Sequence, residues 1–328
     1  MIDRRRFLAS ALALPALPAG AIAARAQERY PSRNITMIVP YPPGGQADFA
    51  GRPIAQALEK VLGRAVIVDN RGGAGGAIGN AAAARAAPDG YTILIGLPVI
   101  AVLPEADRLF GRTPSYEIAQ LAPVARILAD PALLAVPAAS PWKTLQEFVE
   151  DAKKRPGHIT YGSSGIYGTT HVAMEIFAQG AGIKLLHVPY RGVGPAVTGL
   201  LANQINAMAS GPGSVKPHVD SGAMRILANW GDERIPSFPD VPTFKELGYP
   251  DVVYYNWAGL FVPKGLPEPV MTRLREAMAQ AMKDPDAVRI FESGGSAPAY
   301  LDAPEFAKFM EADSARLIAV PRKIGRVE

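Results

Sequence analysis

Short apolar runs alternate with amphipathic stretches along most of this chain. Aliphatic and β-branched residues fill residues 34–40, 65–69 and 91–96. Between the first two runs, residues 48–62 place apolar side chains at helical spacing, and an Ala-rich stretch follows the second. Strands joined by helices of roughly 10–15 residues indicate βαβ units with parallel strands. The first third of the chain therefore predicts an α/β sheet with covering helices.

The same alternation begins again beyond residue 130. Five further apolar runs predict strands at 133–137, 159–162, 185–189, 205–208 and 225–228. Amphipathic segments between them predict helices at 144–155, 171–180 and 195–203. Thr144 is expected to cap the first of these helices, with Glu147 as its capping-box partner. The end of the chain predicts a strand at 259–262 and long helices at 267–283 and 304–318.

Two α/β blocks with a helical return predict a two-lobed α/β fold. Each lobe is expected to hold a parallel-rich sheet, and the chain is expected to cross between the lobes twice. We expect residues 27–128 and 255–328 to form the first lobe, and residues 129–254 the second.

The first 26 residues read as an export signal that is set apart from the fold. A basic start, Arg4-Arg5-Arg6-Phe7-Leu8, precedes an Ala/Leu-rich stretch, and Ala24-Arg25-Ala26 forms a small-x-small cleavage site. The paired arginines indicate the twin-arginine route. A retained membrane anchor is the alternative, but two prolines break the stretch and it is shorter than the roughly 20 residues that span a bilayer. We therefore expect a periplasmic product.

Composition narrows the chemistry that the chain can support. Its 328 residues are 48% hydrophobic and 20% charged, which suits a folded chain of about two domains. The absence of cysteine excludes disulfides, thiolate metal sites and a cysteine nucleophile. Most of the formal net charge of +4 belongs to the export signal, so a nucleic-acid partner is not expected. Four scattered histidines show no metal-ligand spacing, and we expect neither a metal nor a cofactor.

Three glycine-rich turns carry the clearest chemical signal. They cover residues 42–48, 162–171 and 190–195, and each joins a predicted strand to a predicted helix. Glycine lets the backbone approach a ligand, and the first amides of a helix lack intrahelical partners and carry partial positive charge. Such helix starts attract carboxylates or phosphates. Plain turns are the alternative, but in α/β sheets ligands bind beyond the carboxyl ends of strands, where all three turns lie.

We expect the ligand-binding residues on these turns, together with one tryptophan near the return crossover. The candidates are Tyr41, Pro43, Gly44, Gly45, Gln46, Asp48, Ser163, Ser164, Gly165, Tyr167, Thr169, His171, Arg191, Gly192, Val193 and Trp257. Asp48 is also placed to cap its own helix and to pair with Arg52, four residues on. No residue is expected to be catalytic.

Other readings of the glycine-rich segments are weaker. Gly73, Gly75 and Gly79 resemble a dinucleotide fingerprint with one extra residue, but the next strand ends without the acidic residue that would hold a ribose. A serine nucleophile at Ser163 or Ser164 lacks the G-x-S-x-G turn, because Ile166 takes the last position.

A series of motifs, in order and at matching intervals, runs from about residue 30 to residue 319. They are Val39-Pro40-Tyr41-Pro42-Pro43-Gly44-Gly45-x-x-Asp48-x-x-x-Arg52, Asp69-Asn70-Arg71-x-Gly73-Ala74-x-Gly76-x-Ile78-Gly79, Pro88-Asp89-Gly90-Tyr91-Thr92, Tyr161-Gly162-Ser163-Ser164-Gly165, His187-Val188-Pro189-Tyr190-Arg191-Gly192 and Pro239-Asp240-Val241-Pro242-Thr243. The chain thereby resembles the periplasmic substrate-binding proteins of the tripartite tricarboxylate transporter family, the Bug receptors.

The resemblance implies a type II-like periplasmic binding protein whose two lobes close on a ligand like a Venus flytrap. It implies that backbone amides of residues 42–48 and 162–169 hold a carboxylate, often with ordered waters. The ligand would be a small organic carboxylate, aromatic or a dicarboxylate, delivered by a monomer to the membrane permease subunits of a transporter. A sensor subunit of a signalling system stays open as an alternative. An exported enzyme would need a general base, and Asp48 and His171 lack a visible partner.

The chain departs from the family pattern in the second glycine-rich turn. Ile166-Tyr167-Gly168 adds bulk and an aromatic ring where the family usually carries Asn-Gly or Gly-x-Gly. The second-lobe turns also hold no carboxylate that would balance an ammonium group. An amino-acid ligand is therefore less favoured than a simple acid.

Overall fold

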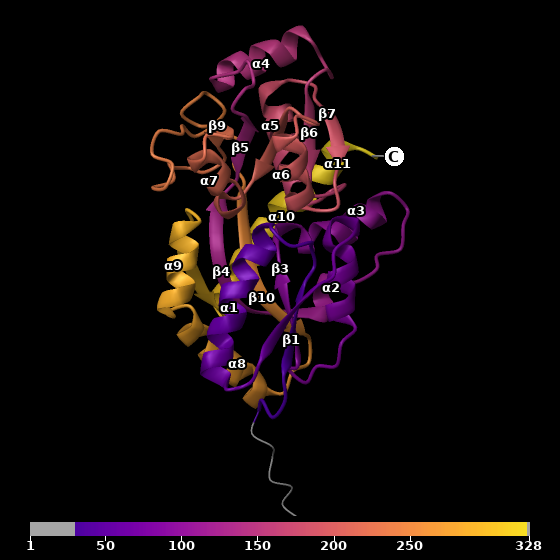
Figure 1. The fold of residues 1–328 in the computed structure, drawn as a ribbon. Coiled ribbons are helices and arrows are strands. Elements are labelled where there is room, and N and C mark those ends of the chain that lie inside the picture. Colours follow the sequence, from indigo (N-terminus) through magenta and orange to yellow (C-terminus); the bar gives the residue numbers. More distant parts are fainter. Residues whose placement is uncertain (1–29, 327–328) are drawn as a thin grey trace, which may run out of the picture.

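The computed structural model describes residues 30–326. The predicted export signal, residues 1–26, lies outside this part of the chain. Within it, the chain forms two α/β lobes, drawn one above the other in Figure 1. The predicted two-lobed α/β architecture with two crossovers is confirmed. No helix among the described residues is long and apolar enough to cross a membrane.

The first lobe is built on a six-stranded sheet with helices on both faces. Its strands, in spatial order, are β11 (Pro298–Asp302), β4 (Leu121–Pro131), β10 (Tyr255–Pro263), β3 (Thr92–Gly96), β1 (Ile35–Val39) and β2 (Val66–Asn70). One face carries α1 (Gln46–Leu62), α8 (Glu268–Ala281) and α9 (Pro285–Ser293); the other carries α2 (Ala77–Ala84) and α10 (Ala303–Ile318).

The second lobe holds a five-stranded sheet. Its strands, in spatial order, are β7 (Leu186–Pro189), β6 (Thr160–Ser163), β8 (Ala207–Ser210), β5 (Leu133–Pro137) and β9 (Met224–Asn229). Its helices are α4 (Leu145–Lys154), α5 (Thr169–Ala181), α6 (Val193–Leu201) and α7 (Pro212–Asp220). The predicted capping box of α4 is confirmed, because Thr144 Oγ1 accepts from the amide of Glu147, and Glu147 Oε2 accepts from that of Thr144.

The lobes are joined by two adjacent crossovers, which explain why the sheets are mixed. β4 leads through Ala132 directly into β5, and β10 brings the chain back antiparallel to β4. Between the two crossovers, Ala132 N donates to Tyr254 O (3.2 Å); Trp230 N, just after β9, donates to Ala132 O (2.9 Å). The predicted parallel pairs, β1 with β2 and β3 and β6 with β7 and β8, lie beside these antiparallel strands.

Two shorter helices connect the lobes at one side. α3 (Val102–Leu109) contacts α10 and the short helix α11 (Val320–Ile324), and α11 in turn contacts α5 of the second lobe. Leu317 and Val320 are buried in the same apolar cluster as Phe177 of α5. Figure 1 accordingly shows the C-terminal end of the chain beside the second lobe, although α10 covers the first.

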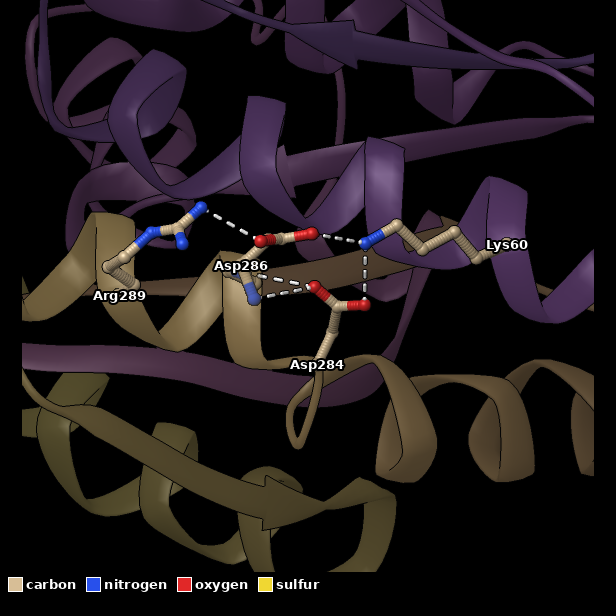
Figure 2. A network of polar contacts seen from close by, with 5 residues as sticks. Lys60, Asp284, Asp286 and Arg289 are labelled. Carbon is tan, nitrogen blue, oxygen red and sulfur yellow. Dashed lines mark hydrogen bonds and ion pairs between the residues drawn. The ribbon is translucent and has the colours of Figure 1, made fainter.

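An ion-pair network on the surface of the first lobe connects α1 with α9 (Figure 2). Lys60 Nζ lies 2.9 Å from Asp284 Oδ2 and 2.8 Å from Asp286 Oδ2. Asp284 also caps α9, since Oδ1 accepts from the amides of Asp286 and Ala287. Because exposed ion pairs contribute little, the cap is the stronger reason for α9 to begin at this point.

Candidate ligand-binding site

The three glycine-rich turns meet where the lobes contact each other. A Cβ atom on Gly194 would lie 2.5 Å from the carbonyl oxygen of Pro43, and one on Gly192 would lie 2.8 Å from the Pro42 ring. A Cβ on Gly165 would lie 3.3 Å from Gly75 Cα. The lobes are therefore closed, and glycine allows backbone of one lobe to touch backbone of the other.

A cavity of about 440 Å³ lies beside these contacts, within the usual range for small-molecule sites. The first lobe contributes Tyr41, residues 73–77, part of α3 and Arg112; the second contributes residues 164–167 and 189–191. The structure thus brings together five of the residues predicted from sequence: Tyr41, Ser164, Gly165, Tyr167 and Arg191. The cavity has one arginine from each lobe, and Arg112 is paired with Asp107 (2.8 Å).

Asp48 shapes the first turn. Its Oδ2 accepts from the amide of Gly44 (3.1 Å), and its Oδ1 accepts from Asn70 Nδ2 (3.0 Å). The predicted pair with Arg52 is present, with 2.9 Å between Arg52 Nη2 and Oδ1. Both carboxylate oxygens are therefore engaged by the protein itself. Asn70 also donates to the carbonyl oxygen of Tyr41 (2.9 Å), and sequence reasoning did not include it among the site residues.

The hydroxyl groups of the second turn stabilise it through hydrogen bonds to its own backbone and side chains. Ser163 Oγ accepts from the amide of Gly165 (3.1 Å) and lies 2.6 Å from His187 Nε2. Thr170 Oγ1 accepts from the amide of Ser164 (2.7 Å), and Thr169 Oγ1 lies 3.5 Å from Ser164 Oγ. Since these side chains are buried and bind the amides of Ser164 and Gly165, they fix the shape of the turn, and the amides left for a ligand are those at the start of α5.

Two stacked imidazoles lie beneath this turn. The rings of His171 and His187 are 4.0 Å apart and nearly parallel, with Tyr161 stacked on His187 at 5.0 Å. The amide of Tyr167 donates to His171 Nδ1 (2.9 Å), which requires that nitrogen to be unprotonated. Burial lowers the pKa of His171 to about 3, with the neighbouring His187 adding to the effect, and burial lowers the pKa of His187 to about 4. Both rings are neutral at pH 7.

These imidazoles should make the protein less stable as the pH falls from 7 to 5. An unfolded histidine has a pKa near 6.5, so the unfolded chain binds more protons than the folded one between that value and the lowered folded values. Asp130 acts in the opposite direction over pH 4–6, because burial raises its folded pKa to about 6. Urea denaturation at several pH values gives the free energy of unfolding as a function of pH. Between pH 7 and pH 5 this free energy should fall less steeply for His187→Gln than for the wild type. The exposed His158→Gln is the control, and equal slopes for all three proteins would contradict this assignment.

Tyr167 connects both lobes and the C-terminal segment. Its backbone has φ = 55°, a left-handed conformation that is costly for a bulky residue. Its ring stacks on Phe110 of the first lobe at 5.5 Å, and its hydroxyl donates to the carbonyl oxygen of Gly325 (2.7 Å). The large side chain of Tyr167, which departs from the family pattern, thus forms contacts between the lobes at one end of the cavity.

The remaining candidates fall into two groups. Pro43, Gly44, Gly45, Gly192 and Val193 form the closed contact between the first and third turns, and Gln46 lies buried beside it. Trp257 is not brought to the turns. It is fully buried against Phe306 and Phe309, and its indole N–H donates to Asp313 Oδ2 (2.7 Å). We therefore assign Trp257 to the core and not to the ligand site.

Two α/β lobes, two adjacent crossovers and strand-to-helix turns that converge between the lobes define the class of two-lobed solute-binding proteins. A family model described as "Tripartite tricarboxylate transporter family receptor" matches residues 50–326. The chain belongs to this family. Protein BugT of Bordetella pertussis is 33% identical over 307 residues, which cover 94% of each chain.

Solved structures agree with this assignment. The periplasmic binding protein BugD has a TM-score of 0.84 at 28% identity, covering 90% of this chain and 98% of its own. Rpa4515 of R. palustris, solved with adipate, has a TM-score of 0.83 at 28% identity, covering 89% and 97%. MatC of Rhodopseudomonas palustris, with bound malate, has a TM-score of 0.82 at 27% identity, covering 89% and 100%.

Proposed function

We propose that this protein is a periplasmic solute-binding protein that captures a small organic carboxylate between its lobes. The observation that carries the proposal is the convergence of glycine-lined helix starts from both lobes. Gly45 precedes α1, Gly168 precedes α5 and Gly192 precedes α6, and none of these helices has a side-chain cap hydrogen bond. Their first amides are therefore suited to carboxylate oxygens.

The relatives support the same ligand class. Adipate and malate, bound in two of the solved structures, are both dicarboxylates. By analogy, the captured acid would be passed to membrane permease subunits of a tripartite tricarboxylate transporter. The paired arginines near the N-terminus support export by the twin-arginine route, and we propose that the protein acts as a monomer without a cofactor.

Binding without catalysis fits the two residues that could serve as a general base. Both oxygens of Asp48 are engaged by neighbouring groups of the protein, and His171 Nδ1 accepts from the amide of Tyr167. Since neither group is left available to take a proton from a ligand, the site favours capture and release over turnover.

Isothermal titration against a panel of carboxylates tests the proposal. Protein stripped of bound ligand by partial unfolding and refolding should bind at least one mono-, di- or aromatic carboxylate with one site per chain. The corresponding primary amides should not bind, because they lack the charge that the helix starts favour. No heat with any acid of the panel, from refolded protein of native secondary structure, would overturn the proposed function.

A further inference from the structure

Four buried polar atoms lack a hydrogen-bond partner where the two lobes and the crossover meet. They are Gln46 Oε1 of α1, Asn256 Oδ1 of β10, Ser210 Oγ at the end of β8 and Ser214 Oγ in the first turn of α7. Their residues are between 0% and 8% exposed. Buried polar groups are almost always paired, so four together indicate a partner from outside the chain.

The orientation of the Gln46 amide is fixed by its neighbours. Its Nε2 donates to Asp130 Oδ2 (2.9 Å) and lies 3.4 Å from the carbonyl oxygen of Asn256. Both neighbours are acceptors, so the nitrogen must face them and the oxygen must face away. That oxygen points at the second lobe, since a Cβ on Gly211 would lie 2.2 Å from it. Asn256 Nδ2 lies 3.6 Å from the same Cβ position, which places both amides against the start of α7.

The buried carboxylate of Asp130 lies next to these amides, on the side away from the second lobe. Asp130 is 5% exposed and lies opposite Asn256 in the register of β4 with β10. It accepts from Gln46 and from Ser296 Oγ (2.8 Å), and no described residue forms an ion pair with it. The turns of the second lobe offer no carboxylate. Asp130, on the crossover strand β4, instead lies one side chain away from the second lobe, because Gln46 binds it on one side and contacts Gly211 on the other.

The chemistry of these atoms selects a donor. Gln46 Oε1, whose orientation is fixed, can only accept a hydrogen bond, and the two hydroxyls can accept or donate. The side-chain amide of Asn256 forms no hydrogen bond with the described residues, so it can present either its oxygen or its nitrogen. A carboxylate oxygen placed against Gln46 Oε1 would be repelled, and the charge of Asp130 would add to the repulsion. A hydroxyl or an ammonium group would satisfy these atoms.

We propose that Gln46, Asn256, Ser210 and Ser214 form a donor-recognising subsite for a hydroxyl or ammonium group on the captured carboxylate. The inference rests on the proposed function and deepens it. The glycine-lined helix starts hold the acid, and this subsite selects acids that also carry a hydrogen-bond donor.

Matched ligand triples test the subsite. Each triple shares one carbon skeleton and carries hydrogen, hydroxyl or ammonium at C2: propionate, lactate and alanine; succinate, malate and aspartate; phenylacetate, mandelate and phenylglycine. Within the triple that binds, titration should show at least tenfold tighter binding for the hydroxyl or the ammonium member than for the unsubstituted acid. The tighter of these two identifies the donor.

The outcomes separate the two proposals. An unsubstituted acid that binds as tightly as its substituted partners would overturn the subsite and leave the proposed function standing, because water alone then satisfies the four atoms. Absence of binding by every acid would overturn the proposed function and the subsite with it.

Asn256→Ala should reduce the preference for the donor-bearing acid at least tenfold. Asn80→Ala is the matched control, because Asn80 is equally buried in α2 and also has an unpartnered Oδ1, but it bonds Tyr116 within the first lobe. Ser214→Ala, which removes a hydroxyl without a partner among residues 30–326, provides a second variant should Asn256→Ala fail to fold. A preference unchanged in the folded variants would contradict the proposal.

Discussion

Gly194→Ala is expected to weaken carboxylate binding by roughly 5- to 150-fold while leaving both lobes folded. The added Cβ would lie 2.5 Å from the carbonyl oxygen of Pro43, a backbone atom of the other lobe. Overpacking of this kind costs about 1–3 kcal/mol, and every 1.4 kcal/mol is a tenfold change in affinity. Within its own lobe the change is favourable, because Gly194 lies in α6 and alanine favours a helix.

Titration and urea denaturation of the same preparation distinguish an effect on closure of the lobes, seen as weaker ligand binding, from an effect on the stability of the unliganded protein. The Gly194→Ala protein should unfold, without ligand, at the same or slightly higher urea concentration than the wild type. Thr198→Ala, an exposed position one turn along α6, is the control and should bind normally. Wild-type affinity in Gly194→Ala would show that the ligand is held without this contact between the lobes.

Asp48→Asn is expected to weaken binding of a carboxylate about tenfold or more. The direction of this effect separates two roles. If Asp48 positions the turn, the asparagine amide group must face a donor, either the amide of Gly44 or Asn70 Nδ2, and the turn loses its shape. If Asp48 faced the ligand, removing its negative charge would instead strengthen the binding of an anion.

Asp69→Asn is the matched control for Asp48→Asn. It removes the same charge near the end of β2, where the Asp69 side chain is partly exposed (36%) and pairs only with Arg71 among the ion pairs of the described chain. Titration of both variants with the same acid should show a loss for Asp48→Asn and little change for Asp69→Asn. Tighter binding by Asp48→Asn would contradict the positioning role.

The alternation of apolar runs and amphipathic segments predicted the lobes because most strands and helices have regular periodicity. Several of the elements that it missed have interrupted patterns. β4 is interrupted by Pro123 and by two charged residues, Arg126 and Asp130, and β11 is a five-residue edge strand without a fully buried side chain. α3 and α7 each contain proline, which sequence reasoning takes as a sign of a turn, although here Pro212 occupies the first turn of α7, where proline is tolerated.

The turns of the candidate site could be found from sequence because each is a local motif. The donor-recognising subsite could not be found, because its members come together only through the register of β4 with β10 and the contact between lobes. β10 also explains why Trp257, a candidate ligand-binding residue in the sequence, lies in the core instead. Successive side chains of a strand point to opposite faces, so Asn256 faces Gln46 and Gly211 while Trp257 faces the aromatic side chains of α10.

A crystal structure of the protein with the tightest-binding acid of the panel would test the central claim most directly. We expect the carboxylate oxygens of the ligand to lie about 2.7–3.2 Å from backbone amides of both residues 43–48 and residues 163–169. A carboxylate held by one lobe alone, or bound outside the contact between the lobes, would contradict this account.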